Sequence, residues 1–394
     1  MKPFQGCYYL GAYRAFSSIK DGFLLVHSVS GCNWGALALS QMGRQDAIHQ
    51  GTTMMHENEI VFGGEGKLAE ALAILKNHGP KRVYVLNGCP TDMIHDDVQS
   101  VIDEADCPFP VHWMNTAGYK GSMRQGYIDA MGYLAGILPR CESAGDRSVN
   151  LIGISSDDYR GEADAESIRR MLAPEVRVNA LLPMLTEDSM KTFGQAALNV
   201  VFRGFEAVGE ALKESLGMDY VVVDYPYGAS GSEAFLKKID ECMGCDHGDR
   251  IAVGNRSAEG LAKQVLHPLR MIYQAETAVA GDHTRAEALR RFLADEMGFR
   301  VTAYLDDIDA GADNAAWMEH VQNSGICIAF GSSFERQVED MAPVKLVRFA
   351  YPVMDSVALG YQPYAGYDGL PILLSDILNA LMTVSYRRNG RFNP

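Results

Sequence analysis

The sequence predicts an α/β fold made of three Rossmann-like, doubly wound units in succession. Short apolar runs with the character of buried parallel strands alternate along the chain with amphipathic runs of helical spacing. The 394 residues, of which 47% are hydrophobic, can bury two or three separate cores. We therefore expect an N-terminal unit over residues 1–147, a second over 148–273 and a third over 274–394.

The first unit alternates strands and helices, which we expect at residues 23–27, 66–77, 82–87, 93–102, 110–114 and 121–138. In the first of these helices Leu68 and Leu72 recur at helical spacing, and Gly79 with the following proline ends the helix. In the second helix, the carboxylates of Asp96 and Asp97 suit the positive end of the helix dipole. Such alternation predicts a parallel sheet covered by helices.

The second and third units repeat the alternation with strands and helices of their own. In the second unit we expect strands at 149–154, 176–181, 199–202 and 220–224 and helices at 163–172, 205–215 and 232–245. A long helix at 258–273 then leads to the third unit. There we expect strands at 276–280, 300–305, 326–330 and 346–351 and helices at 285–297, 315–322 and 371–382.

Three cysteines next to glycine are the main candidates for a functional site: Cys7, Cys32 and Cys89. Cys32 and Cys89 each follow a buried-strand pattern, and ligands bind at the carboxyl ends of strands in open α/β sheets. Thiolates there can hold a soft metal centre, and the glycines let a bulky cluster approach the backbone. A free cysteine is commonly a small hydrophobic residue, so the spacing alone leaves metal binding and packing equally open.

The other five cysteines carry weaker signals. Eight cysteines in 394 residues do not form a disulfide framework, and we expect Cys107, Cys141 and Cys327 to be structural thiols. Cys242 and Cys245 form a Cys-x-x-Cys pair that closes a predicted helix, with only His247 nearby as a further ligand. A zinc site normally needs a second ligand pair, so we expect a non-catalytic role for these two cysteines.

Charge and missing motifs exclude several classes of function. The net charge of −15 and the pI of about 5.1 argue against binding to nucleic acid or to an anionic membrane surface. No signal-peptide pattern and no run of about 18 apolar residues occurs, so we expect a cytoplasmic protein that contacts no membrane. The chain has neither a P-loop nor a Gly-x-Gly-x-x-Gly after a strand, which argues against ATP hydrolysis and standard NAD binding.

At its cysteines the chain resembles the nitrogenase component 1 superfamily. That family carries a Cys, then His-Gly-x-x-Gly-Cys, then Glu-x-x-x-Val-Phe-Gly-Gly, then a strand-end Cys followed by Gly-Asp-Asp. The corresponding segments here are Cys7, 27–32, 57–64, and Cys89 with 95–97. Two glycines of the pattern are replaced, one by Ser28 and one by His95.

Among the two paralogous subunit types of this family, the chain resembles the β type. The α type binds its active-site cofactor partly through a late histidine, which would fall near Ser356, whereas His320 is the last histidine here. Segments 225–236 and 349–355 resemble β-type motifs, and 366–369 matches a C-terminal family motif. Only the Glu-Gly-Lys sequence after Phe-Gly-Gly is closer to the α type.

The resemblance implies a fold, a cofactor and partners. It implies three Rossmann-like domains around a cleft, with Cys7, Cys32 and Cys89 binding half of a shared iron–sulfur cluster. The cluster would be an 8Fe-7S cluster of the P-cluster type, or alternatively a 4Fe-4S cluster. The other half would come from an α-like paralogous subunit in an α2β2 heterotetramer, and a homodimeric iron–sulfur ATPase would deliver the electrons. We also expect Glu57 to be buried beside the cluster region, where it caps the turn at 62–64 or, as the alternative, takes part in proton or electron delivery.

The resemblance leaves several functions open. The retained cysteines and the short chain, in which Cys7 comes almost first, favour a nitrogenase-like reductase. The specific member we infer is the β-like subunit of a methylthio-alkane reductase, which cleaves C–S bonds reductively. The alternatives are a nitrogenase β subunit and a cofactor-assembly scaffold. A dark-operative protochlorophyllide reductase is less expected, because its β-like subunit contributes an Asp ligand. A sugar- or anion-binding α/β protein with coincidental cysteines fits the motifs least.

Overall fold

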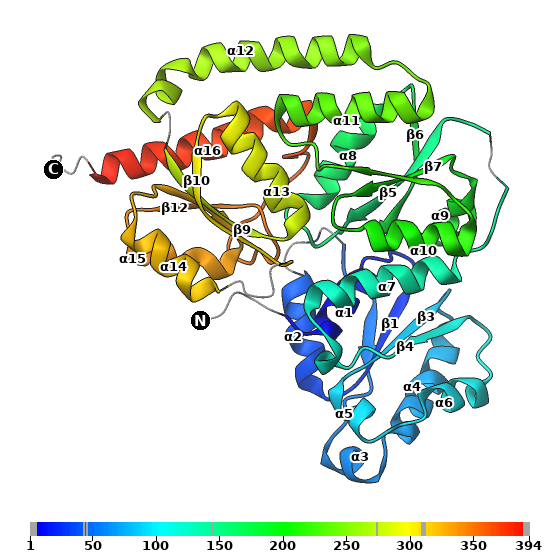
Figure 1. Ribbon diagram of the computed structural model, residues 1–394. Helices are drawn as coiled ribbons and strands as arrows, with labels where there is room; N and C mark the ends of the chain where they lie inside the picture. The colour runs from blue at the N-terminus through cyan, green and yellow to red at the C-terminus, as the bar shows by residue number, and fades with distance from the viewer. Residues whose placement is uncertain are drawn as a thin grey trace.

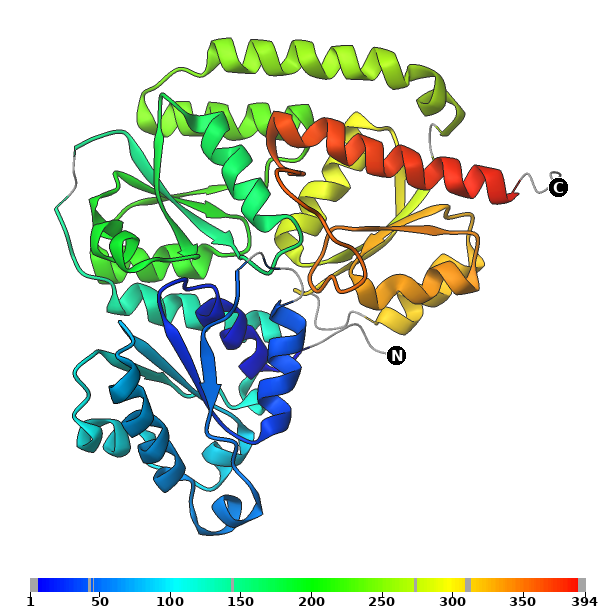
Figure 2. The same ribbon diagram turned by 180° about the vertical axis from the view of Figure 1, so that it is seen from behind.

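The three predicted units are present, each built on its own parallel sheet (Figure 1). The computed structural model describes residues 6–41, 44, 46–142, 145–272, 275–308 and 313–388. The N-terminal unit lies below the other two in Figure 1, and the view from behind shows the same three lobes around a common centre (Figure 2). In the described part of the chain, no helix is long and apolar enough to cross a bilayer.

All three sheets have four parallel strands and the same strand order. The first sheet contains β1 (Phe23–His27), β2 (Gln50–Thr52), β3 (Val83–Asn87) and β4 (Val111–Met114), in the order β2-β1-β3-β4. The second contains β5 (Ser148–Ile154), β6 (Arg177–Pro183), β7 (Leu198–Phe202) and β8 (Tyr220–Val223), in the order β6-β5-β7-β8. The third contains β9 (Glu276–Gly281), β10 (Arg300–Asp306), β11 (Ile328–Gly331) and β12 (Lys345–Arg348), in the order β10-β9-β11-β12.

This shared order places a topological switch point in every unit. In the first sheet β2 lies on the outer side of β1, and β4 lies on the opposite outer side, next to β3. The connections that follow β1 and β3 therefore run over opposite faces of the sheet. The same holds for β5 with β7 and for β9 with β11. Folds of this kind bind ligands outside the carboxyl ends of the two central strands, so this edge of each sheet is the place where a site is expected.

The helices of the first unit differ most from the prediction. They are α1 (Tyr8–Ser17), α2 (Ser30–Gln41), α3 (Glu57–Phe62), α4 (Glu65–His78), α5 (Cys89–Met93), α6 (Val98–Ala105) and α7 (Met123–Ile137), with a 3₁₀ turn η1 (Gly118–Lys120). The single helix predicted at 93–102 is wrong, because α5 and α6 are separate helices. The Asp97 carboxylate caps α6 by accepting the Ser100 N–H at 3.0 Å. Gly79, with φ 61°, ends α4 as predicted.

The helices of the second and third units mostly match their predicted positions. In the second unit they are α8 (Gly161–Leu172), α9 (Glu187–Thr192), η2 (Phe193–Gln195), α10 (Glu206–Leu216), α11 (Gly228–Met243) and α12 (Gly248–Ile272). In the third they are α13 (His283–Arg291), the π-helical turn η3 (Phe292–Glu296), α14 (Asn314–Asn323), η4 (Ser333–Gln337), α15 (Val338–Met341) and α16 (Gly366–Arg388). Helix α12 begins ten residues before the predicted start, and its predicted last residue, Tyr273, lies outside the described residues.

Two helices connect the units. Helix α7 of the first unit packs against α1 and also against α10 of the second unit. Helix α16, drawn in red in Figure 1, contacts β12 of the third unit and α8 and α11 of the second. The three sheets fall within the ranges proposed for the three domains, but these two helices are shared, so the domain boundaries remain our proposal.

A buried network of charges fills the centre where the three units meet. Arg14 of α1 donates to Asp157 at 3.1 Å and to Asp158 at 3.0 Å, two carboxylates that follow β5. Arg285 of α13 lies 3.8 Å from the Asp158 carboxylate and donates to the Tyr159 carbonyl at 2.8 Å. Burial alone would raise the pKa of Asp157, but the Arg14 guanidinium outweighs burial and holds that pKa below its usual value.

We predict that Arg14→Met strongly destabilises the protein. The substitution leaves a buried carboxylate unpaired, which should lower the free energy of unfolding by roughly 3–5 kcal/mol. Arg177→Met is the matched control, because Arg177 pairs with Asp146 at 2.7 Å on the surface and its loss should have little effect. Urea unfolding measures both variants, and equal losses of stability would refute the importance of the central pair.

Candidate functional site

The fold brings the three predicted cysteines to one end of the first sheet. Cys7 precedes α1, Cys32 lies in the first turn of α2 after β1, and Cys89 is the first residue of α5 after β3. Strands β1 and β3 are hydrogen-bonded neighbours that flank the switch point of this sheet. Parallel strands end at the same edge, so Cys32 and Cys89 converge there, and Cys7 joins them from the start of α1.

Two glycines mark the space between the thiols. The Gly118 N–H donates to Cys89 Sγ at 3.1 Å. A Cβ atom on Gly118 would lie 3.0 Å from Cys7 Sγ and 3.2 Å from Cys89 Sγ, so the two sulfurs flank the same glycine. A Cβ atom on Gly88 would lie 3.6 Å from Cys32 Sγ. At Gly118 any side chain would therefore occupy the space next to the Cys7 and Cys89 sulfurs, whereas at Gly88 the Ser28 side chain already fills the nearest space.

The thiols are close but spread around a space wider than one ion needs. Burial raises the pKa of Cys32, and the nearby Cys89 and Cys7 raise it further. The three sulfurs do not all lie within 4.8 Å of one another. Soft sulfur donors of which at least two are more than 4.8 Å apart suit an iron–sulfur cluster, in which separate iron atoms can bind them, better than a single metal ion.

The site faces outward, and the elements that follow its cysteines in the chain carry exposed apolar side chains. Cys7 is exposed, and Cys32 and Cys89 are half-buried. The neighbouring helices α2, α3 and α5 and the turn η1 carry five large side chains whose exposed fractions are high. They are Phe62 at 86%, Val61 at 71%, Met93 at 69%, Trp34 at 63% and Tyr119 at 61%. Large exposed apolar side chains of this kind are typical of surfaces that contact another protein.

The remaining residues of the cysteine motifs form a clamp behind the site. The buried His27 ring bonds Asp96 at 3.1 Å through Nε2 and Thr53 at 3.1 Å through Nδ1. The Asp96 carboxylate also accepts the Gly64 N–H at 2.9 Å, and a Cβ on Gly64 would lie 2.6 Å from Asp96 Oδ2. The second glycine of Phe-Gly-Gly and the first acidic residue after Cys89 thus fix the loops around β1 and β3 to each other.

The structure also explains one departure from the family pattern and corrects one prediction. His95, where the family has glycine, adopts a left-handed conformation with φ 59°, which glycine accommodates at lower cost. Glu57 is exposed, so the prediction that it is buried and caps the turn at 62–64 is wrong. The neighbouring Glu59 provides the cap of α3 instead, accepting the His56 N–H at 2.7 Å.

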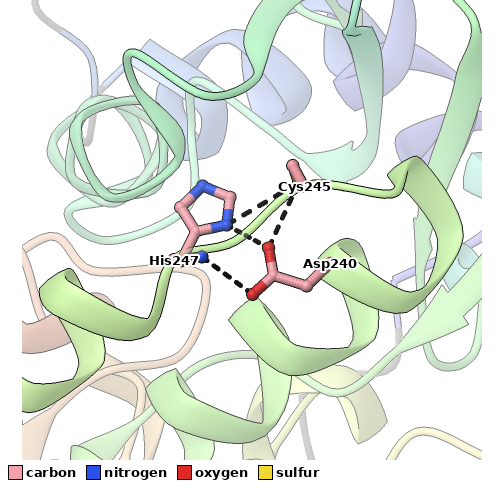
Figure 3. A group of neighbouring side chains, drawn as sticks. All are labelled: Asp240, Cys245 and His247. Carbon is pink, nitrogen blue, oxygen red and sulfur yellow. Dashed lines mark hydrogen bonds and ion pairs between the residues drawn. The ribbon is translucent and has the colours of Figure 1, made fainter.

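The other cysteines lie away from this site. Cys107, Cys141 and Cys327 are each partly buried, and Cys327 precedes β11 rather than lying inside the strand as predicted. Cys242 is exposed at the end of α11, whereas Cys245 lies beside Asp240 and His247 (Figure 3). The sequence alone indicates His247 as a further ligand, but it does not single out Asp240. The feature that could have identified Asp240 is its place in the last turn of the helix, five positions before Cys245.

The chain is similar to known proteins over nearly its whole length. Residues 7–308 match the family described as nitrogenase component 1 type oxidoreductase. The chain is 22% identical to the B-type chain of the light-independent protochlorophyllide reductase of Rippkaea orientalis, over 96% of this chain and 82% of that protein. It is 24% identical to the nitrogenase molybdenum-iron protein beta chain of Frankia alni, over 97% of this chain and 82% of that protein.

Two further similarities agree with these. The nitrogenase iron-iron protein beta chain of Rhodobacter capsulatus is 24% identical, over 97% of this chain and 94% of that protein. A solved structure described as nitrogenase Cp1 at pH 6.5 superposes with a TM-score of 0.85, covering 100% of this chain and 96% of that one at 18% identity. At that identity the structural likeness establishes the fold, and it agrees with the three-unit architecture predicted from the sequence.

We predict that Gly88→Ala destabilises the protein through Ser28. The added Cβ would lie 2.0 Å from Ser28 Oγ and 2.8 Å from Ser28 Cβ, inside a buried loop. Overpacking of this kind costs roughly 1–3 kcal/mol of unfolding free energy. Adding Ser28→Gly to Gly88→Ala should restore most of the loss. Gly136→Ala is the control, because a Cβ there meets nothing within 4 Å. A double variant no more stable than Gly88→Ala would disprove the clash.

Proposed function

The chain belongs to the nitrogenase component 1 type oxidoreductases, as a β-type member, and we propose that it is the electron-relay subunit of a nitrogenase-like reductase. The observation that carries this proposal is the convergence of Cys7, Cys32 and Cys89 at the switch point of the first sheet. A relay site must hold a redox centre at a surface that another protein can cover. The outward-facing thiols and their apolar surroundings meet that requirement.

In this proposal the three thiolates hold one half of an iron–sulfur cluster of the P-cluster type. Such a cluster would supply electron transfer at a potential set by the cluster type, the hydrogen bonds to its sulfurs and its exposure to solvent. The Gly118 N–H stabilises negative charge on the Cys89 sulfur, and this kind of hydrogen bond is one determinant of a cluster's reduction potential. The clamp of His27, Asp96 and Gly64 keeps the Cys32 and Cys89 loops at a fixed separation.

The centre of the molecule supports placing substrate reduction in a partner subunit. Buried side chains that pair with one another occupy the junction of the three units, led by Arg14, Asp157 and Arg285. Ser356 lies near the position where an α-type member would have its cofactor histidine, and its hydroxyl bonds the Tyr159 hydroxyl at 3.1 Å. We therefore assign to this chain the relay of electrons and to an α-like paralogue the binding of the active-site cofactor.

The partner would cover the cluster site. A half-cluster exposed to water loses iron by oxidation, and Phe62, Val61 and Trp34 offer apolar contact area beside it. We propose an α2β2 heterotetramer whose αβ interfaces bury more than roughly 2,000 Å² each, as obligate interfaces do. A separate homodimeric iron–sulfur ATPase would supply the electrons, because this sequence has no P-loop of its own.

The narrower proposal for the reaction is reductive C–S cleavage in a methylthio-alkane. The alternatives are dinitrogen reduction as a nitrogenase β subunit and a non-catalytic role in cofactor assembly. Turnover separates these three. The co-purified complex, supplied with the ATPase, ATP and a reductant, should release a thiol from a methylthio-alkane. Ammonia formation would favour nitrogenase, and a complex that releases matured cofactor without turnover would favour the scaffold.

Co-expression with an α-like chain encoded by a neighbouring reading frame tests the proposed assembly. We expect the two chains to elute together as a heterotetramer on size exclusion and to carry iron bound at their junction. The expected reason is that each chain supplies half of the cluster ligands. A homodimer of this chain that held a full iron complement and reduced substrate unaided would refute the proposal.

Replacing the candidate ligands should remove iron. We predict that Cys7→Ala, Cys32→Ala and Cys89→Ala each lower the iron content of the complex and abolish electron transfer, since each opens an iron coordination position. Cys107→Ala is the matched control, a partly buried cysteine of the same unit that should leave iron unchanged. Iron assay with circular dichroism separates ligand loss from misfolding. Full iron retention in folded Cys32→Ala would rule out the assignment.

A spacing variant tests the same site without removing a sulfur. Gly118→Ala places a methyl group about 3 Å from the sulfurs of Cys7 and Cys89, in the space that a cluster would need. We predict a lower iron content with all thiols still present, counted by thiol titration of the unfolded protein. Gly136→Ala serves again as the control, and an unchanged iron content in Gly118→Ala would place the cluster elsewhere.

A further inference from the structure

A second group of metal-binding side chains lies far along the chain from the cysteine site. Asp240 belongs to the last turn of α11, and Cys245 and His247 belong to the connection from α11 to α12 (Figure 3). One ligand atom from each of the three residues lies within 4.8 Å of the other two. Among the residues that the structure describes, these three form the group of His, Cys, Asp and Glu side chains whose ligand atoms all lie this close together.

The contacts converge on a common point. Cys245 Sγ lies 3.1 Å from Asp240 Oδ1 and 3.9 Å from His247 Nδ1. His247 Nδ1 also contacts Asp240 Oδ1 closely, and Asp240 Oδ2 accepts the His247 backbone N–H at 2.9 Å. Around a tetrahedral zinc ion the ligand atoms are separated by roughly 3.3–3.8 Å. Small side-chain shifts would therefore bring the three atoms to coordination distance.

A hydrogen bond on the other side of the His247 ring determines which ring nitrogen can bind a metal ion. His247 Nε2 lies 3.0 Å from the Leu172 carbonyl oxygen, which can only accept a hydrogen bond. Nε2 therefore carries a proton, and in the neutral ring Nδ1 presents its lone pair to Asp240 and Cys245. Histidines that ligate metals are commonly held this way, with the other ring nitrogen donating to a carbonyl.

The site is largely closed and has charges of both signs around it: the Arg147 guanidinium donates to the Gly244 carbonyl at 2.9 Å, next to Cys245. His247 is buried, and Cys245 is partly buried. The Glu175 carboxylate lies 3.7 Å from His247 Nε2 and adds a further negative charge beside the ring. A lone pair on Nδ1 facing the Asp240 carboxylate is repulsive unless a cation or a proton lies between them.

We propose that Asp240, Cys245 and His247 bind one divalent cation of the zinc class, independently of the iron–sulfur site. The mixed sulfur, nitrogen and oxygen donors suit zinc and disfavour magnesium and calcium, which bind oxygen ligands. The fourth position would be taken by water. Since His247 also bonds α8 through Leu172, the cation would fasten the α11–α12 connection to the second unit, and its role would be structural.

The Cys-x-x-Cys pair itself provides a matched control. Cys245→Ser removes the sulfur of the proposed site, whereas Cys242→Ser changes an exposed cysteine three positions earlier. The iron-loaded complex is dialysed against buffered zinc, and its zinc and iron contents are measured together. We expect one zinc ion per chain of this type in the wild type and in Cys242→Ser, and none in Cys245→Ser, with iron equal in all three.

Two further readouts keep the test decisive. Cobalt(II) in place of zinc should give a thiolate-to-cobalt absorption band in the wild type and in Cys242→Ser, which His247→Gln should weaken. A chelator should lower the melting temperature of the wild type and of Cys242→Ser, but not of Cys245→Ser. No zinc in the wild type, or the same zinc content in both serine variants, would overturn the proposal and leave a proton shared by Asp240 and His247 in its place.

Discussion

The ion pairs of Arg14 with Asp157 and Asp158 constrain the rest of the structure. Helix α1 carries Arg14 and begins directly after Cys7, so the pairing that holds the helix against the second unit also sets the position of the cysteine. Arg285 extends the network to the third unit. Since charges buried this deeply are costly when unpaired, separating the three units would leave Arg14 and Asp157 without partners and would lower the stability of the fold.

The three units share one topology but use it for different purposes. Each has the same strand order and hence a switch point between its two central strands. In the first unit Cys32 and Cys89 follow the strands at this point, and the site that they form faces outward. In the second and third units carboxylates follow β5 and β9: Asp157 is buried at the centre, and Asp282 is partly buried and caps α13. A redox centre is thus favoured at the surface of one unit, while the junction of all three holds the fold together.

The sequence predicted the strands other than β2, because buried parallel strands have a simple apolar pattern, as in 23–27 and 149–154, which the polar run Gln50–Thr52 lacks. It failed for α2 and α3, where Gly31, Gly35 and a short polar run hide the helix, and for the break between α5 and α6. Cys7 and Cys89 are brought together at Gly118. Asp240 and Cys245 are brought together by the way α11 ends. The contacts with Gly118 depend on tertiary structure, which no local sequence pattern reveals, whereas Asp240 and Cys245 are close in the chain and come together where the helix ends. The family motifs pointed to the cysteines without showing their separation.

The most direct test is to locate iron in crystals of the co-purified complex by anomalous diffraction at the iron absorption edge. We expect anomalous density bounded by Cys7, Cys32 and Cys89 of this chain and closed on its other side by the partner subunit. Iron found only inside the partner, with these three thiols unligated, would contradict the assignment of a shared cluster.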